Sequence, residues 1–443
     1  MNQKMRKLVM LLCGTTLSCV PYQVRAQNEV LTASLHNLYT TAHAHNANLQ
    51  SCQAAINEAI AAIETARMSK LPDVKGQVSV SYLGNVRLWN RKFDDSQSAP
   101  MPHFGNNFLL RAEQVLYTGG AIKNEIKLAQ QNAQMYQLAS AEAEQRVRFV
   151  LTSLYFQLHN LHNQQRVYET NIALANEQIN LMKKRREQGV SLRNDVTRYE
   201  LQLQQINLGR ATVIDQQSIL LHQLNTALGT DSIQLKMLGE EAFNEQTIEE
   251  DTESSWQQRA AEEHLGIRQS GLTIDMSRTR ERMTRAERLP KVALIAEDHL
   301  DGPITIEVPP INKNLNYWYV GVGVSYNFSS LYKTKRKISQ SRLTTTLATD
   351  RLIETRQHVS DEVHKAYVNL QTARTELTSH LKSVQLASEN YDVVSRRYQN
   401  GLALVTDLTD AANIRLEAEL SLANARINLI YSYYSLKYAA HSL

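Results

Sequence analysis

Glycine, proline and long hydrophobic runs are scarce in this sequence. Its 443 residues include 16 Gly and 8 Pro, the residues that most often mark turns and loops. So few of them predict few turns and long elements, unlike the loop-rich domains of a conventional enzyme. The mean hydropathy of -0.39 and the hydrophobic content of 42% exclude a polytopic helical membrane protein.

Excess charge is also absent from most of the chain. The formal net charge is +4, and the first 26 residues account for it, because they contain Lys4, Arg6, Lys7 and Arg25 but no Asp or Glu. Without these four, the 48 Lys and Arg fall to 44, which equals the 44 Asp and Glu. A neutral chain has no general electrostatic attraction for nucleic acid, so we expect no nucleic-acid partner.

Residues 1–26 have the features of a secretory signal peptide. A basic start at Met1–Arg6 precedes an apolar run at Leu8–Val20, and Val24 and Ala26 provide the small residues that signal peptidase prefers. We expect cleavage before Gln27 and export from the cytoplasm.

The sequence holds only three cysteines, and Cys13 and Cys19 lie within the predicted signal peptide. Lipidation of Cys19 is an alternative fate, although Thr16-Leu17-Ser18 is a poor lipidation motif. After cleavage Cys52 is the one cysteine left, so no intrachain disulfide can form.

Motifs for enzyme chemistry are missing. Gly321-Val322-Gly323 resembles the start of a dinucleotide-binding loop, but it lies inside a predicted strand and no third glycine follows. His159 and His162 lie one helical turn apart without a carboxylate on the same stripe. We therefore predict no catalytic, cofactor-binding or metal-binding residues, and no enzyme.

An internal repeat organises the chain. Lys184–Gly189 followed by Asp195–Thr197 corresponds to Arg396–Gly401 followed by Asp407–Thr409, at an offset of 212 residues. Such self-similarity indicates a duplicated structural unit. The predicted divisions are a first repeat at 27–228, a connecting segment at 229–252 and a second repeat at 253–443.

Each repeat reads as helix, strand, strand, long helix and returning helix. Apolar residues recur every three or four positions in the helical segments, the spacing of a coiled-coil seam. Residues 121–187 contain no Gly or Pro and predict a rod of about 100 Å at about 1.5 Å per residue. The predicted elements are 29–70, strands 74–88 and 108–117, 121–187 and 194–228 in the first repeat, then 253–288, strands 291–299 and 317–328, 331–399 and 406–440 in the second.

The predicted strands alternate between an apolar and a small or polar face. Val320, Val322 and Val324 oppose Gly321 and Gly323, the period expected of a sheet with one buried face. A soluble sheet shows the same alternation, but a lipid-facing sheet fits an exported chain. Because four strands cannot close a barrel and an open edge is not tolerated in lipid, the chain must then oligomerise.

The turns that end the two long helices carry exposed apolar candidates. A glycine at each turn can end a helix in a left-handed conformation, and the apolar residues beside it then simply hold the turn together. Apolar residues at the tip of a long rod also suit docking of a partner protein. The candidate docking residues are Gly189, Val190, Leu192, Gly401, Leu402 and Leu404.

Aspartates follow both turns at the same distance. Asp195 and Asp407 lie six residues after their glycines, where a carboxylate can cap the returning helix. Asp410 lies one helical turn beyond Asp407. In a symmetric oligomer Asp407 and Asp410 would form stacked acidic rings, which repel unless hydrated, protonated or neutralised by a cation; a plain solvated face is the alternative.

Taken together, these features resemble the TolC family of bacterial outer-membrane efflux proteins over nearly the whole chain after the signal peptide. The resemblance rests on the repeat, on Leu71-Pro72 and Leu289-Pro290 at the ends of helices, on Leu116–Gly120, and on both glycine-to-aspartate spacings. It implies a homotrimer in which four strands per chain make one 12-stranded transmembrane β-barrel, continued by a coiled-coil-like α-helical barrel across the periplasm.

The resemblance also implies roles for residues at the helix tips. Asp195 and Tyr398 occupy positions of the links that close the periplasmic aperture, and Asp407 and Asp410 match its constricting acidic residues. One departure is Ala403, where many members carry arginine. The closed aperture would then be held mainly by hydrogen bonds and packing.

The implied function is passive conduction across the periplasm and outer membrane, as the exit duct of a tripartite efflux or type I secretion system. Its partners would be a periplasmic adaptor, an inner-membrane transporter and outer-membrane lipid, with no cofactor. Substrate and pump class stay open. Two alternatives are a secreted coiled-coil rod without a pore, which does not explain the duplicated strands, and a periplasmic adaptor, which needs one hairpin rather than two repeats.

Overall fold

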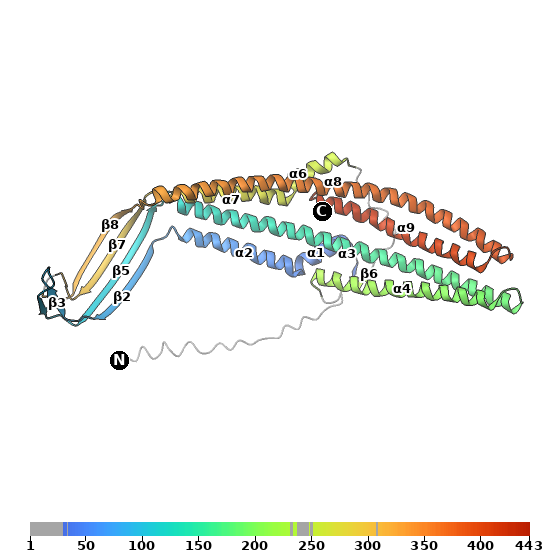
Figure 1. Cartoon of the computed structure of the whole chain (residues 1–443), viewed down its shortest axis with the longest axis horizontal. Helices are drawn as coiled ribbons and strands as arrows, with labels where there is room; N and C mark the ends of the chain where they lie inside the picture. Colours follow the sequence, from blue (N-terminus) through green and yellow to red (C-terminus); the bar gives the residue numbers. More distant parts are fainter. Residues whose placement is uncertain (1–29, 33, 231–233, 237–247, 249–250, 307–308) are drawn as a thin grey trace.

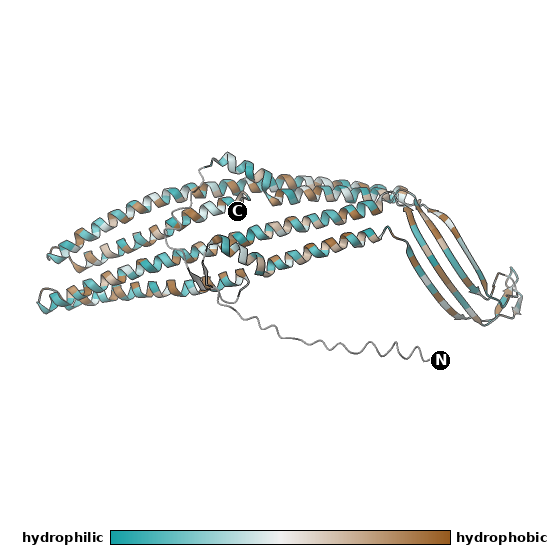
Figure 2. Ribbon diagram, turned by 180° about the vertical axis from the view of Figure 1, so that it is seen from behind, coloured by the Kyte–Doolittle hydropathy of each residue, from teal (hydrophilic) through white to brown (hydrophobic). Residues whose placement is uncertain are grey.

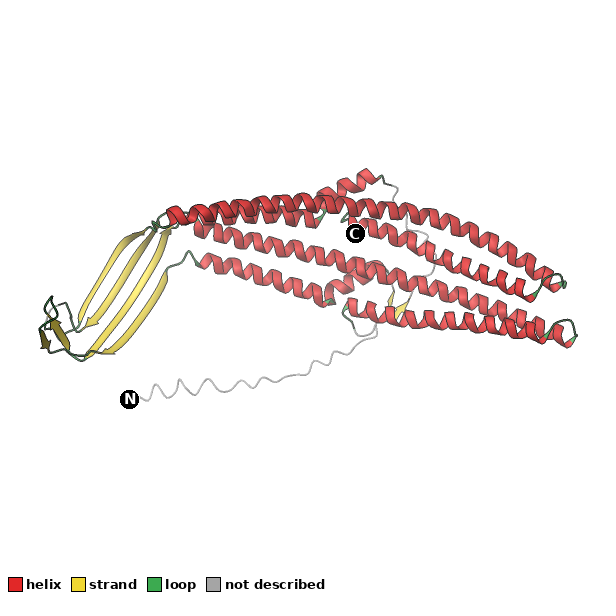
Figure 3. Ribbon diagram, viewed as in Figure 1, coloured by secondary structure: helices red, strands yellow, loops and turns green. Residues whose placement is uncertain are grey.

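The computed structural model describes residues 30–32, 34–230, 234–236, 248, 251–306 and 309–443. The predicted signal peptide, with Cys13 and Cys19, lies outside the described residues, as does most of the predicted connecting segment 229–252. The chain is an elongated bundle of helices with a four-stranded sheet at one end and two helix turns at the other (Figure 1). Helices dominate in Figure 3, and the prediction of a mainly α, duplicated fold with some β is confirmed.

The first half of the chain contains one complete set of helices and strands. Its two longest helices are joined by a short turn, and its two long strands lie between helices. The elements are β1 (Val30–Thr32), α1 (Leu35–His45), α2 (Ala47–Met68), β2 (Asp73–Tyr82), β3 (Val86–Trp89), β4 (Ser96–Ala99), β5 (Phe104–Tyr117), α3 (Ala121–Glu187) and α4 (Arg193–Leu228).

The second half repeats this order. A short strand, which pairs in parallel with β1, precedes it. The elements are β6 (Gln234–Lys236), α6 (Glu253–Glu263), α7 (Leu265–Ala286), β7 (Lys291–Gly302), β8 (Leu315–Ser325), α8 (Ser330–Gln399) and α9 (Val405–Ala439).

The helices predicted at 29–70 and 253–288 are both broken, which corrects the prediction of continuous helices. Asn46 and His264 have extended backbones, with φ/ψ of -66°/121° and -62°/117°. Asn46 Oδ1 accepts the backbone N–H groups of Asn48 and Leu49, and His264 Nδ1 accepts that of Gly266. Each side chain thus caps the second helix of its pair, and the cap replaces the helical bonds lost at the break.

The strand boundaries also differ from the predictions. The stretch predicted as one strand at 74–88 divides into β2 and β3, and β3 pairs with β4 in a separate two-stranded sheet within the predicted loop. β5 begins before residue 108, β7 continues past 299, and β8 ends before 328. Pairing partners decided these limits. β5 and β7 share a ladder from Asn106–Gly302 to Tyr117–Val292, and β5 begins at Phe104 because that residue still pairs with Tyr82 of β2.

The long strands form one antiparallel sheet in the order β2-β5-β7-β8, with β2 and β8 at its edges. One face is mainly apolar and carries many exposed side chains, including Val78 at 68% and Trp318 at 73%. The other face carries charged and hydroxyl side chains such as Arg111, Glu297 and Tyr319. Figure 2 shows the resulting alternation of hydrophobic and hydrophilic residues along the strands.

Two long helices run from the sheet to the turns, and shorter helices cover them in two sections. On the sheet side, α2 packs against α3, and α7 packs against both α8 and α3. On the turn side, α4 packs against α3, and α9 packs against both α8 and α3. None of the helices in the described ranges combines the length and apolarity needed to cross a membrane.

Candidate functional site

The turns α3–α4 and α8–α9 have the same backbone geometry. Gly189 and Gly401 have φ of 76° and 75°, a left-handed conformation that costs residues with a Cβ more than glycine. The N–H of Val190 donates to the carbonyl of Arg185 at 2.9 Å, and that of Leu402 donates to Arg397 at 2.8 Å. These bonds satisfy the last carbonyls of each long helix.

The apolar residues of these turns project into solvent. Their exposed fractions are between 63% and 71%, far above those of core residues, so they do not hold the turns together by mutual burial. The residues are Val190, Leu192, Leu402 and Leu404. Within one chain the structure therefore leaves an apolar tip on each hairpin, as a docking surface requires.

Asp195 and Asp407 cap the helices that return from the turns. Asp195 Oδ2 accepts the backbone N–H of Leu192 at 3.2 Å, and Asp407 Oδ2 accepts that of Leu404 at 3.0 Å. A carboxylate in the first turn also lies favourably in the field of the helix. Asp407 and Asp410 are exposed on α9, so an acidic pair separated by one helical turn faces outward at this end of the chain.

Tyr398 comes from the end of α8 and lies against the other hairpin. Its side chain is buried. Burial raises the pKa of the Tyr398 hydroxyl, and the charge of Asp195 raises it further. The Ser191 hydroxyl is near enough to oppose this shift, yet the buried Tyr398 oxygen forms no hydrogen bond of normal geometry with the described residues. The structure thus brings Tyr398 and Asp195 close together, without a direct bond, where the end of α8 meets the α3–α4 turn. We call this region the hairpin junction.

Arg185 is a residue of this junction that the sequence analysis missed. From the last turn of α3, its Nη1 donates to the carbonyl of Gln399 at 2.7 Å and to that of Tyr398 at 3.5 Å. Its guanidinium also lies 5.6 Å from the centre of the Tyr398 ring. A cation at the C-terminal end of α8 is favourable because the helix dipole leaves partial negative charge on those carbonyls.

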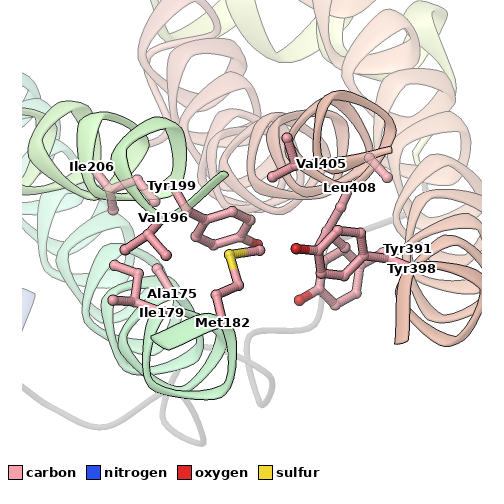
Figure 4. Close-up of a cluster of buried hydrophobic side chains, with 11 residues drawn as sticks. Ala175, Ile179, Met182, Val196, Tyr199, Ile206, Tyr391, Tyr398, Val405 and Leu408 are labelled. Carbon is pink, nitrogen blue, oxygen red and sulfur yellow. The ribbon is translucent and has the colours of Figure 1, made fainter. Parts of the chain in front are cut away.

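A buried cluster of side chains from α3, α4, α8 and α9 lies next to the junction, on the side of the turns that faces the sheet. Figure 4 shows Tyr199 of α4 pointing toward the ring hydroxyls of Tyr391 and Tyr398 of α8, with Met182 of α3 beside them. All four side chains belong to one core that joins both hairpins, together with Ala175, Ile179, Val196, Ile206, Val405, Leu408 and Ala411. Burial also raises the pKa of the Tyr199 hydroxyl.

Ala403, which stands where the resemblance implies arginine, is half-buried and packs against this same core. A methyl group cannot form a charged link, so the position contributes packing here. Arg185 is the cation that reaches across between hairpins. In the sequence Arg185 is one of four consecutive basic residues from Lys183 to Arg186. Nothing in this run distinguishes Arg185 from its neighbours.

The structure offers no candidate metal centre in the part of the chain that it describes. No group of three or more His, Cys, Asp and Glu side chains there is arranged to hold a metal ion. Gly321 and Gly323 lie within β8, and no helix begins beside them. The junction of the hairpins, with its tyrosines, aspartates and Arg185, is therefore the candidate functional site.

Comparisons with known proteins agree with this architecture. A model of a family described as outer membrane efflux protein matches residues 38–230 and 256–440, one match for each half. A comparison with curated protein sequences found no match.

Several solved outer-membrane channels share the fold. The chain is similar to CusC, with 14% identity, 93% of this chain and 92% of that chain covered, and a TM-score of 0.78. For VceC from Vibrio cholerae the identity is 14%, the coverage 92% and 95%, and the TM-score 0.72. For the open state of the Neisseria gonorrhoeae MtrE channel the values are 15%, 92% and 88%, and 0.71.

The family match favours a channel over the pore-free rod and the periplasmic adaptor that the sequence left open. It spans most of the chain and includes both hairpins, both strand pairs and the junction between them. The chain belongs to the outer membrane efflux protein family, and it is an outer-membrane channel that extends into the periplasm.

Proposed function

We propose that three copies of the chain form the exit duct of a tripartite efflux or type I secretion system. The observation that carries this proposal is the four-stranded sheet with one apolar face, one polar face and two free edges. Such a sheet is stable in lipid only when its edges pair with other strands. Three copies supply twelve strands, with β8 of one copy beside β2 of the next.

The helices would continue this barrel as a tunnel. At about 1.5 Å per residue, α3 and α8 reach roughly 100 Å from the sheet, and both end in turns that expose apolar residues. We infer that a periplasmic adaptor docks on Val190, Leu192, Leu402 and Leu404 and that an inner-membrane transporter loads substrate and supplies the energy. Conduction through the duct itself is passive.

The gate would lie at the hairpin junction. Tyr398 and Arg185 hold the end of α8 against α3, while Asp195 adds its charge beside Tyr398. In the trimer Asp407 and Asp410 of three chains would face the axis as acidic rings. Opening would shift α9 and the end of α8 away from α3 and α4. This motion would break the bonds from Arg185 to Gln399 and from Gln202 to Asn413, which join the two hairpins.

Single-channel recording in planar bilayers tests both the channel and the gate. The double variant Tyr398→Phe with Asp195→Ala removes the hydroxyl that faces Ser191 of the other hairpin and the carboxylate that caps α4 beside it. Because both polar groups lie where the two hairpins meet, we expect higher conductance than in the unmodified protein. The matched control is Tyr136→Phe with Asp215→Ala, two exposed positions away from the turns, which should leave conductance unchanged.

The two possible failures are distinct. Absence of channels from the unmodified, correctly inserted protein would contradict the proposed duct. Channels of equal conductance in all three proteins would support the duct and remove Tyr398 and Asp195 from its gate.

A further inference from the structure

The end of α7 and the beginning of α8 form a pocket of about 710 Å³ close to the sheet. Cationic side chains dominate its lining, which contains no carboxylate, and two apolar side chains lie among them. We call it the basic pocket. Its lining includes Arg285, Arg288, Leu289, Lys335, Ile338 and Arg342.

Only part of the positive charge of the basic pocket is neutralised. Glu281 Oε1 lies 2.5 Å from Arg285 Nη2 and 3.4 Å from Arg342 Nε. The side chains of Arg288 and Lys335 form no ion pair or hydrogen bond with any residue in the described part of the chain. These two cations are therefore available to an anion from outside the chain.

The concentration of positive charge is a feature of the second repeat alone. Residues 330–349, at the beginning of α8, include five Lys and Arg but no Asp or Glu. Residues 121–140, at the corresponding beginning of α3, include two Lys and one Glu. A general need for basic residues beside the sheet would have affected both repeats, so this charge marks one place in each chain.

The basic pocket lies at the level expected for lipid headgroups. β8 has 11 residues, about the length that a tilted strand needs to cross the hydrocarbon of a bilayer. Leu289 comes two residues before β7 begins, and Lys335 lies about 8 Å beyond the start of α8 at about 1.5 Å per residue. The headgroup layer extends roughly 5–8 Å beyond the hydrocarbon on each side. In the proposed duct the pocket therefore borders the periplasmic leaflet.

The basic pocket opens on the side of the helices that faces away from the proposed lumen. α7 and α9 occupy equivalent places, since both run toward the sheet between α3 and α8. With about 3.6 residues per turn, the side of α9 that carries Asp410 corresponds to the side of α7 that carries Arg280. Arg285 and Leu289 lie on the opposite side of α7. Because Asp410 would face the axis of the duct, the pocket faces outward.

An apolar path connects the basic pocket with the sheet. Leu331, Lys335, Ile338 and Arg342 follow one another at intervals of three or four residues, which places them on one stripe of α8. Leu331, the member of this stripe nearest the sheet, is 47% exposed, and its neighbour Tyr332 is 66% exposed. The stripe thus changes from apolar to cationic with distance from the sheet, as the surface of a lipid changes from acyl chain to phosphate.

We propose that the basic pocket binds the phosphate of an anionic phospholipid from the periplasmic leaflet of the outer membrane. Basic pockets at a membrane surface bind anionic headgroups, and guanidinium groups match the geometry of phosphate oxygens. Inorganic phosphate has the same charge chemistry but no acyl chain to contact Leu331. This inference rests on the proposed trimeric duct, and it assigns that duct a specific lipid partner.

Native mass spectrometry of detergent-purified trimers, titrated with phosphatidylglycerol, tests this site. We expect one lipid to bind for each chain. The double variant Arg288→Gln with Lys335→Gln removes the two unpaired cations, so its dissociation constant for phosphatidylglycerol should rise about tenfold. Each substitution alone should raise this constant roughly threefold. Zwitterionic phosphatidylcholine should bind more weakly, and inorganic phosphate at equal concentration should not displace phosphatidylglycerol.

Arg280→Gln with Lys333→Gln is the matched control. Both residues are exposed on the same two helices but do not line the pocket, so this variant loses the same charge and should bind phosphatidylglycerol like the unmodified protein. Equal affinity in all proteins, an equal loss in the control, or displacement by inorganic phosphate would overturn the lipid site while leaving the duct intact. Failure of the unmodified protein to form trimers would overturn the duct, and the lipid site with it.

Discussion

At the residue scale, Arg185 shows how hydrogen bonds can connect the two hairpins without a salt bridge. Its partners are backbone carbonyls at the end of α8 rather than a carboxylate. Hydrogen bonds from an ionised donor are stronger than neutral ones, and the tie adds ring contact with Tyr398. Arg185 thus holds α8 in the region where Ala403 has no charge to offer.

We expect Arg185→Gln to raise single-channel conductance, because a neutral amide holds the carbonyls of α8 less strongly. Its effect should be less than additive with Tyr398→Phe, since both changes weaken one junction. Arg186→Gln is the control, because Arg186 is exposed in the same helical turn. If both arginine variants conduct like the unmodified protein, Arg185 is not part of the closed gate.

At the element scale, each repeat has one break between its first two helices. The residue that caps the second helix at this break differs between the two repeats. Asn46 caps α2 through an amide oxygen, whereas His264 caps α7 through the unprotonated Nδ1 of its ring. Burial, together with the nearby His441, lowers the pKa of His264 to about 4. The ring centres of His264 and His441 are 4.5 Å apart.

This difference predicts acid sensitivity. In the unfolded chain His264 has the ordinary histidine pKa of 6.5, but in the folded chain it binds a proton only near pH 4. Its contribution to stability is therefore fully present above pH 6.5 and is lost as the pH falls from 6.5 toward 4. His441, whose pKa burial also lowers, acts in the same direction, while Glu142, Glu362 and His358 modify the field.

Thermal unfolding of the purified protein between pH 7.5 and 4.5 measures this effect. The variant His264→Asn copies the cap of the first repeat without a titrating group, so we expect a smaller fall in Tm on acidification. His43→Asn replaces an exposed histidine as control. Equal pH dependence in His264→Asn and the unmodified protein would contradict a role of this cap.

At the scale of the whole molecule, the sheet is the part that a single chain leaves unfinished. Its apolar face exposes large side chains such as Val78, Trp318 and Val322, and its edge strands β2 and β8 pair on one side only. The helices, in contrast, bury three clusters of apolar residues within one chain. Lipid and neighbouring copies would complete the sheet in the proposed duct.

We expect Val322→Lys to abolish trimers that are stable in detergent and to reduce insertion into the outer membrane. Val322 belongs to the apolar face, where a lysine that faces lipid costs up to about 4 kcal/mol per chain, depending on its depth in the bilayer. Gly321→Lys is the control, because this neighbour lies on the polar face with open space at its Cβ position. Heat-modifiable bands on gels report assembly. Equal assembly of both variants would show that Val322 does not contact lipid.

Much of this fold was predictable because its signals are local. Unbroken stretches without Gly or Pro, such as 121–187, specify helices through hydrogen bonds that each segment satisfies itself. The alternation around Val320 to Val324 specifies a two-faced strand in the same way. The breaks at Asn46 and His264 were missed because a cap at mid-segment depends on a neighbour, as shown by the bond from Asn46 Nδ2 to the carbonyl of Ala227.

The candidate site likewise has some features that the local sequence predicts and others that only the folded chain shows. The order of residues was enough to establish the duplication, the glycine turns and the spacing of Asp195 and Asp407, because each is a pattern along one segment. The packed chain was needed to show that Arg185 reaches Gln399 and that Arg111, Glu297 and Tyr319 share one row. Those contacts join residues far apart in the chain, and their distances depend on how helices pack and how strands register, which no local pattern encodes.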